Sequence, residues 1–261
     1  MTARDLVVIG AGGSSREIAE SVRRLTAAGP RWRLAGFLDD DPALEGRTLD
    51  GLPVLGPLRL ARENPGWSLV IGVAHPRYPD VRRRIAAALG LPAARFAALA
   101  DATATIAGSA RLRAGSVVLA HAVVSHEADV GEHVLVSALC SVSHGVRLDE
   151  GVTLAAGAIV SGSSRVGAGA YLGAGCVVRD GLTVGAGAVV GLGAVVVRDV
   201  PAGATVVGNP ARPLPPRASA VSERDRREGA AATEGADRQE AVGGRTPAED
   251  RRPLDAGSAR P

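Results

Sequence analysis

An aliphatic residue recurs at every sixth position from residue 106 to residue 196, without a break. The sixteen positions are Ile106, Leu112, Val118, Val124, Val130, Val136, Val142, Leu148, Leu154, Val160, Val166, Leu172, Val178, Val184, Val190 and Val196. A period of six matches neither the 3.6-residue period of an α-helix nor the two-residue alternation of a flat strand, and is typical of the hexapeptide repeat of a parallel β-helix. The pattern therefore predicts a β-helix over residues 99–212, with three hexads per coil. Residues eighteen apart should then stack on neighbouring coils at about 4.8 Å.

Both cysteines of the chain, Cys140 and Cys176, fall in the small inward column of this repeat, two coils apart. Two coils span roughly 9.6 Å, more than the ~7 Å over which a disulfide joins two Cα atoms. We predict two free thiols in the core.

Residues 1–98 have the pattern of a small α/β domain. A buried strand at residues 5–9 runs into a glycine turn, and a helix is predicted from Ser15 to Ala28. Two more strands are predicted at residues 34–38 and 69–73, and a second helix at residues 80–89. This is the pattern of a half-Rossmann βαβ unit.

Ligands of such domains bind at the carboxyl ends of the strands, where the N–H groups of the glycine turn and of the helix N-terminus receive anions. The third glycine of the dinucleotide fingerprint is replaced by Ser15, so we favour a sugar or nucleotide-sugar site over NAD. A purely structural domain, with a solvated acidic turn, is the alternative. The candidate contacts are Gly12, Gly13, Ser14, Asp39 and Asp40.

The remaining features of the sequence mainly exclude functions. The chain carries 30 basic residues, all of them Arg, and a net charge of +3. These residues are scattered rather than gathered in a stripe, so we predict no nucleic-acid binding. No apolar run approaches the length of a membrane span and the N-terminus lacks the pattern of a signal peptide, so we expect a cytoplasmic protein without membrane contact. Residues 213–261 contain few large apolar residues and are predicted to be a disordered tail.

Several motifs together resemble one family. They are the glycine turn, the segment Gly36-Phe37-Leu38-Asp39-Asp40-Asp41, the uninterrupted hexads, and the closing Asp199-Val200-Pro201 and Gly208-Asn209-Pro210-Ala211. Over residues 5–212 the chain resembles the sialic acid O-acetyltransferases and UDP-4-amino-sugar N-acetyltransferases (NeuD/PglD-like). The resemblance implies a left-handed β-helix and a homotrimer with acetyl-CoA between neighbouring subunits. It also implies a sugar acceptor on the N-terminal domain, a histidine general base and no metal.

Two histidines compete for the role of the base. Counts from Gly208-Asn209-Pro210 backward, and from the domain junction near Asp101 forward, both place the family's base at His144. Locally, however, His126 followed by Glu127 looks more like the family's His-acid pair, and a reading in which neither histidine is catalytic stays open.

The chain departs from the family around this base. The acidic residue that follows the base is replaced by Gly145, the upstream Asn by Ser137, and a second His by Thr153. Since Glu127 lies one coil from Gly145 in the same column, its carboxylate could reach the His144 ring; otherwise it is a solvated surface acid. For acetyl-CoA the resemblance points to Thr153, Gly162, Ala174 and Leu192.

The resulting hypothesis is an acetyltransferase that moves acetyl from acetyl-CoA to an amine or hydroxyl of an amino sugar, a nucleotide-activated sugar or a sialic-acid-like acceptor. A catalytically inactive sugar-binding or scaffolding trimer is the alternative in another class, and an acyltransferase for a natural-product intermediate is a third. Outward apolar residues such as Val123, Leu135 and Val195 need cover and favour the trimer.

Overall fold

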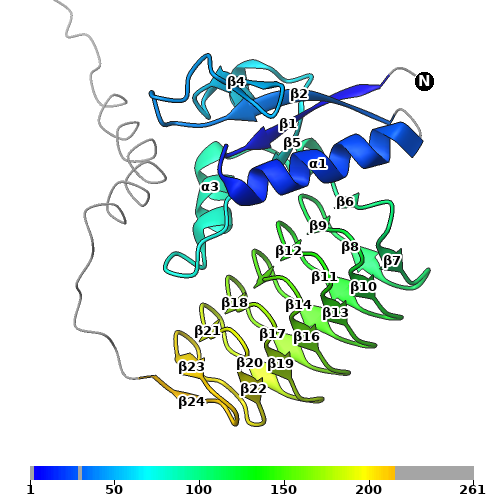
Figure 1. The fold of residues 1–261 in the computed structure, drawn as a ribbon, viewed down its shortest axis with the longest axis vertical. Coiled ribbons are helices and arrows are strands. Elements are labelled where there is room, and N and C mark those ends of the chain that lie inside the picture. The colour runs from blue at the N-terminus through cyan, green and yellow to red at the C-terminus, as the bar shows by residue number, and fades with distance from the viewer. Residues whose placement is uncertain (1–2, 29–30, 215–261) are drawn as a thin grey trace, which may run out of the picture.

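The computed structural model describes residues 3–28 and 31–214, which form an α/β domain stacked on a parallel β-helix (Figure 1). The sheet of the α/β domain has the order β3-β4-β2-β1-β5, and the helices lie on its two sides. Its elements are β1 (Arg4–Ile9), α1 (Gly13–Ala28), β2 (Trp32–Leu38), β3 (Thr48–Leu49), β4 (Leu52–Gly56), the four-residue α2 (Leu60–Glu63), β5 (Ser68–Ile71), α3 (Val81–Leu89) and a 3₁₀ turn (Ala93–Arg95).

The three predicted strands and two predicted helices of this domain are confirmed to within two or three residues at their ends. The β3–β4 hairpin is an addition that the sequence prediction missed. Its turn, Asp50-Gly51, has φ values of 49° and 76°, which a short hairpin requires and which Asp-Gly supplies most readily. The dipeptide was therefore a usable signal for this hairpin.

The β-helix has three flat faces, each a sheet of two- or three-residue strands that are parallel except for the last strand of the docking face. The docking face consists of β6 (Leu99–Ala100), β9 (Val117–Val118), β12 (Leu135–Val136), β15 (Thr153–Leu154), β18 (Tyr171–Leu172), β21 (Val189–Val190), β23 (Thr205–Val207) and the antiparallel β24 (Arg212–Pro213). The apolar face consists of β7 (Thr105–Ile106), β10 (Val123–Val124), β13 (Ser141–Val142), β16 (Ile159–Val160), β19 (Val177–Val178) and β22 (Val195–Val196). The charged face consists of β8 (Arg111–Leu112), β11 (Asp129–Val130), β14 (Arg147–Leu148), β17 (Arg165–Val166) and β20 (Thr183–Val184).

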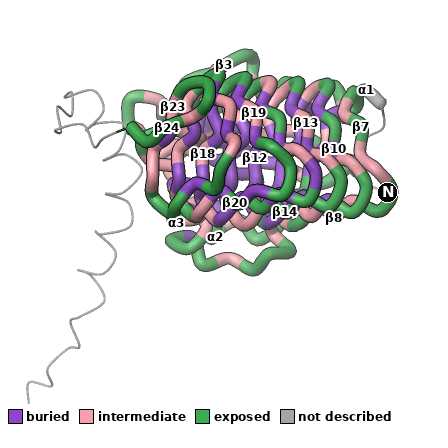
Figure 2. The backbone as a smooth tube through the Cα atoms, turned by 90° about the horizontal axis from the view of Figure 1, so that it is seen from below, coloured by how far each residue is buried: buried purple, intermediate pink, exposed green. Residues whose placement is uncertain are grey.

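The register confirms the predicted repeat. Val123 pairs with Ser141, and Ser141 pairs with Ile159, so each coil takes eighteen residues. The second residue of nearly every strand points inward and joins one continuous core that runs from Val118 to Val206. Figure 2 shows the buried stretches along these strands and the exposed ones at the outer turns. Cys140 and Cys176 are free and buried in this core, as predicted.

The α/β domain covers the docking face. Ile18 and Val22 of α1 pack against Leu119 and Leu135 of the first coils, and Figure 1 shows α1 lying across these coils. The prediction that Leu135 needs cover from another subunit is wrong, because α1 leaves it only 2% exposed. Val123 on the apolar face is 41% exposed, as predicted for a surface that needs cover.

None of the helices within residues 3–28 and 31–214 combines the length and apolar character that a membrane crossing demands. The predicted disordered tail lies outside the described residues from residue 215 onward. Its first two residues are described: Pro213 is the second residue of β24, and the Leu214 N–H donates a hydrogen bond to the Thr205 carbonyl.

Candidate active site

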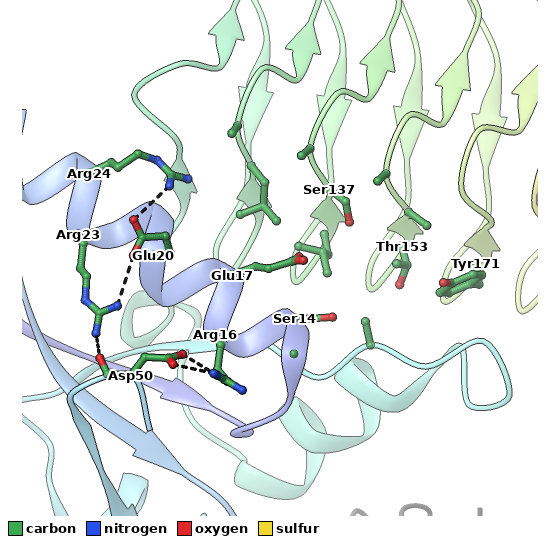
Figure 3. Close-up of a pocket in the computed structure, with 18 residues that line it drawn as sticks. Ser14, Arg16, Glu17, Glu20, Arg23, Arg24, Asp50, Ser137, Thr153 and Tyr171 are labelled. Atoms are coloured by element: carbon green, nitrogen blue, oxygen red, sulfur yellow. Dashed lines mark hydrogen bonds and ion pairs between the residues drawn. The ribbon is translucent and has the colours of Figure 1, made fainter. Parts of the chain in front are cut away.

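A cavity of about 870 Å³ lies between α1 and the docking face (Figure 3). One wall is the first three turns of α1, from Gly13 to Arg24. The other wall is the docking face and the turns that lead from it to the apolar face, and it includes Ser137, Thr153 and Tyr171. We call the edge formed by these turns the pocket edge. The cavity therefore joins the two parts of the chain that the sequence assigns to acceptor and acetyl transfer.

The glycine turn opens onto one end of this cavity. Gly13 and Ser14 line it, and a Cβ added to Gly12 or Gly13 would meet no atom within 4 Å. The opposite side of the turn is held by Asp39, whose Oδ2 accepts a hydrogen bond from the Ala11 N–H at 2.8 Å. The start of α1 therefore has open space beside Gly12 and Gly13, which leaves room for an anion at the helix N-terminus.

The two predicted acidic contacts both serve the main chain. The second oxygen of Asp39 accepts from the Asp41 N–H at 3.0 Å, and Asp40 Oδ1 accepts from the Leu58 N–H at 2.8 Å. Burial raises the pKa of Asp40, outweighing this hydrogen bond. Neither carboxylate lines the cavity. Asp39 shapes the turn that presents Gly12 and Gly13, and Asp40 holds the segment that follows β4.

His126 and His144 stack on neighbouring coils, as their spacing of eighteen predicts. Their ring centroids are 5.5 Å apart and the rings are inclined by 24°. Both side chains are exposed, in the turns that lead from the apolar face to the charged face, which we call the histidine edge. Behind His144 the chain has Gly162, where a Cβ would come within 2.5 Å of the imidazole. The His144 ring is therefore held between His126 on one side and a glycine on the other.

Glu127 occupies the corner position of its coil, with φ of 58°, and Gly145 occupies the same position one coil later with φ of 63°. The Glu127 N–H donates to Ser109 Oγ at 3.1 Å. Among the described residues, no hydrogen bond or ion pair joins the Glu127 carboxylate to either imidazole. In a single chain His144 therefore has no acidic partner.

The four residues suggested for acetyl-CoA do not lie together in one chain. Thr153 is buried on the docking face, and Gly162 lies beneath His144 on the histidine edge. Ala174 and Leu192 lie on the pocket edge, where Leu192 is 82% exposed. The apolar face separates these two edges, so a site containing all of them needs a second copy of the chain.

Sequence reasoning missed Arg82, which locks the two domains together. Its fully buried guanidinium donates hydrogen bonds to the carbonyls of Val73, His133, Gly151 and Val152 and to Thr153 Oγ1, at 2.7–3.0 Å. Burial lowers the pKa of Arg82 to about 10. The spacing of Ile85 and Leu89 on α3 places Arg82 on the same buried face, which was the available signal.

His133 also lies at this junction, where it is only 4% exposed. Its ring meets Phe96 edge-on at a centroid distance of 4.6 Å, and its Nδ1 has no hydrogen-bond partner in the part of the chain that the structure describes. Burial lowers its pKa, against the opposing charge of Glu150, and the nearby charge of Arg82 acts in the same direction as burial. His133 is therefore a packing residue of the domain junction.

Comparisons with known proteins agree with this architecture. Residues 5–89 match the family model of the PglD N-terminal domain. The acetyltransferase domain of PglB from Neisseria gonorrhoeae FA1090, solved with acetyl coenzyme A, is 37% identical over 81% of this chain and all of that one, with a TM-score of 0.71. PerB from Caulobacter crescentus, solved with CoA and GDP-perosamine, is 30% identical over 80% of this chain and 97% of that one, with a TM-score of 0.68. No curated protein sequence matches the chain significantly.

A structure of the perosamine N-acetyltransferase from Caulobacter crescentus carries an asparagine in place of one histidine and was solved with CoA and GDP-perosamine. It is 28% identical to this chain, covering 81% of this chain and 97% of that one, with a TM-score of 0.70.

A half-Rossmann domain docked on an uninterrupted hexapeptide β-helix, with an exposed histidine at an edge, defines a two-domain hexapeptide acyltransferase. Within that class, the chain belongs to the NeuD/PglD-like family of acetyltransferases.

Proposed function

We propose that this protein transfers acetyl from acetyl-CoA to the amine of a nucleotide-linked amino sugar, with His144 as the general base. The observation that carries the proposal is the His144 ring, exposed at an edge of the β-helix and seated between His126 and Gly162. The relatives solved with acetyl-CoA, and with CoA and GDP-perosamine, support the choice of the two substrates. We assign residues 1–98 to the acceptor and residues 99–212 to acetyl transfer. A cytoplasmic location would give such an enzyme access to both substrates.

In the proposed reaction the amine nitrogen attacks the thioester carbonyl carbon. A carbon–nitrogen bond forms, the carbon–sulfur bond breaks, and the amine proton passes to His144 and then to the departing thiolate. A neutral imidazole is the side chain best matched to this task near neutral pH. Because Gly145 offers no carboxylate, Glu127 or a group from a neighbouring copy would stabilise the imidazolium.

A homotrimer completes the site in this proposal. The cavity lies at the pocket edge and His144 at the histidine edge, so one chain does not bring them together. A threefold axis parallel to the β-helix keeps every coil at the same height in all copies. His144 of one copy then faces the pocket edge of the next at the level of Ser137 and Thr153. Acetyl-CoA would lie in the groove between them, against Gly162 of one copy and Ala174 and Leu192 of the other.

The glycine turn is the proposed site of the nucleotide diphosphate. Gly12 precedes a sixteen-residue helix that begins with Gly13 and Ser14, and the N-terminal N–H groups and dipole of this helix favour a negative charge. A sugar attached to this diphosphate would extend into the cavity toward the docking face.

Replacing His144 by Ala tests the proposal. Release of CoA thiol with acetyl-CoA and amino-sugar nucleotides should fall by about 10²- to 10⁴-fold, the usual loss when a general base is removed. The melting temperature should be unchanged because the ring is exposed. His126→Ala and Glu127→Gln are measured in the same assay for comparison. A larger loss of activity in His126→Ala than in His144→Ala would mean that the base is His126, one coil closer to the N-terminus.

A second candidate is a catalytically inactive sugar-binding trimer. It is favoured by one observation, that no described carboxylate contacts His144. In that case the wild-type protein would release no thiol from acetyl-CoA with any amino-sugar nucleotide, yet would bind these nucleotides in calorimetry.

A further inference from the structure

Among the described residues, one charged side chain of the cavity has no hydrogen-bond or ion-pair partner. Arg16 pairs with Asp50 at 2.5 Å, and Glu20 pairs with Arg23 and Arg24 at 3.3 and 3.4 Å. Figure 3 shows these pairs as dashed lines. Glu17 lines the same cavity but makes no hydrogen bond or ion pair with any described residue. The charges around the cavity are thus compensated except for one carboxylate.

The position of Glu17 makes this carboxylate available to a ligand. It is exposed on the cavity side of α1, and in Figure 3 its oxygens point away from the Arg16–Asp50 pair toward the β-helix wall near Ser137. That wall carries hydroxyl groups, from Ser137, Thr153 and Tyr171, but no exposed cation. Arg82 lies behind Thr153, and its hydrogen bonds go to carbonyls and to Thr153. The three arginines of the cavity, Arg16, Arg23 and Arg24, are paired with other carboxylates, so a positive group that faces Glu17 would have to come from the ligand.

We propose that Glu17 binds the amino group of the acceptor sugar and selects an amine over a hydroxyl. This inference rests on the proposed function and deepens it. Glu17 lies four residues after Gly13, which is about 6 Å along the helix. A sugar whose diphosphate sits at the glycine turn can reach it with a substituent on the far side of the ring. A carboxylate forms a charge-assisted hydrogen bond with an ammonium or amine and a weaker one with a hydroxyl.

The test compares matched pairs of acceptors that differ by one group. GDP-perosamine carries an amine where GDP-rhamnose carries a hydroxyl, and a UDP-linked 4-amino-4,6-dideoxyhexose with its hydroxyl counterpart gives a second pair. Initial rates of acetyl transfer are measured for the wild type, Glu17→Gln and the control Glu63→Gln. Glu63 is the last residue of α2, lies outside the cavity and pairs with Arg59.

The wild type should prefer the amine in kcat/KM, and Glu17→Gln should reduce this preference about tenfold or more, chiefly through a higher KM for the amino sugar. The hydroxyl acceptors and Glu63→Gln should show no such change. Because Glu17 is exposed and unpaired, the melting temperature of Glu17→Gln should equal that of the wild type.

Two results would overturn the inference while leaving the proposed function standing. One is an unchanged amine preference in Glu17→Gln, and the other is a wild-type enzyme that acetylates the hydroxyl acceptors as well as the amines. If the wild type acetylates none of the four acceptors, the proposed function fails and the role of Glu17 fails with it.

Discussion

At the scale of single residues, the seat of His144 depends on a glycine. Positions 108, 126, 144 and 162 share one register on successive coils, and they hold Gly, His, His and Gly. Two rings fit into this column because the next position has no side chain. Gly162 therefore matters because it has no side chain to collide with the His144 ring, and not because of its backbone conformation.

Gly162→Ala should displace the His144 ring without unfolding the β-helix. The added Cβ would lie 2.5 Å from the ring, and a side chain can rotate away at little cost. Because misplacing a catalytic group by about 1 Å can cost up to 10²-fold, we expect acetyl transfer to fall by about tenfold or more with an unchanged melting temperature. The matched control is Gly108→Ala, where a Cβ meets no atom within 4 Å. Equal activity in both variants would contradict the proposed seat.

At the scale of elements, α3 fastens the α/β domain to the docking face through Arg82. Its partners His133, Gly151 and Thr153 belong to two successive coils, so this one side chain bridges α3 to both. A second link joins α1 to the first coil, where the buried Asp101 accepts hydrogen bonds from Ser21 and Arg24 at 2.6 and 2.7 Å. Although burial raises the pKa of Asp101, its hydrogen bonds outweigh burial and hold that pKa well below the usual range.

Arg82→Ala should lower the free energy of unfolding by about 3 kcal/mol or more, because it leaves buried carbonyls without donors and opens a cavity. Denaturant unfolding measures this loss, and proteolysis should cleave the junction between the domains faster. Arg84→Ala, an exposed position two residues further along α3, is the control and should change stability by less than about 0.5 kcal/mol. A small effect of Arg82→Ala would mean that the apolar contacts of α1 suffice for docking.

At the scale of the whole molecule, the three faces of the β-helix differ in what covers them. The α/β domain covers the docking face. The charged face carries exposed ion pairs such as Arg113–Asp129 and Arg165–Asp149, and it can therefore remain in contact with water. The apolar face exposes Val123 and Ile159, at 41% and 38%, and Leu139 at the adjoining edge is 65% exposed. This is the surface that the proposed trimer would bury.

Charges on the apolar face should therefore separate the copies. The double variant Val123→Glu, Ile159→Glu should scatter light as the 26.3 kDa chain, whereas the wild type should give three times that mass. It should also lose acetyl transfer, because His144 and the cavity would no longer meet. Thr183→Glu, on the charged face, should leave both properties unchanged. A monomeric wild type with full activity would contradict the shared site.

The sequence by itself determined the β-helix, its register and the stacking of His126 on His144. Each coil repeats the same environment at a fixed separation of eighteen residues. The residues that stack on neighbouring coils can therefore be read from the period of the sequence. It also determined the glycine turn and the main elements of the α/β domain, because buried strands and amphipathic helices carry local patterns.

Tertiary structure alone decided how the two parts meet. Arg82 donates a hydrogen bond to the His133 carbonyl, 51 residues away in the sequence, and no repeat in the sequence predicts this contact. Helix α1 covers Leu135, which the repeat pattern placed at the surface. The cavity, the unpaired Glu17 and the separation of His144 from the pocket edge all follow from this docking. Which side chains face each other there depends on packing between elements far apart in the chain, and the spacing of residues along the sequence does not encode that packing.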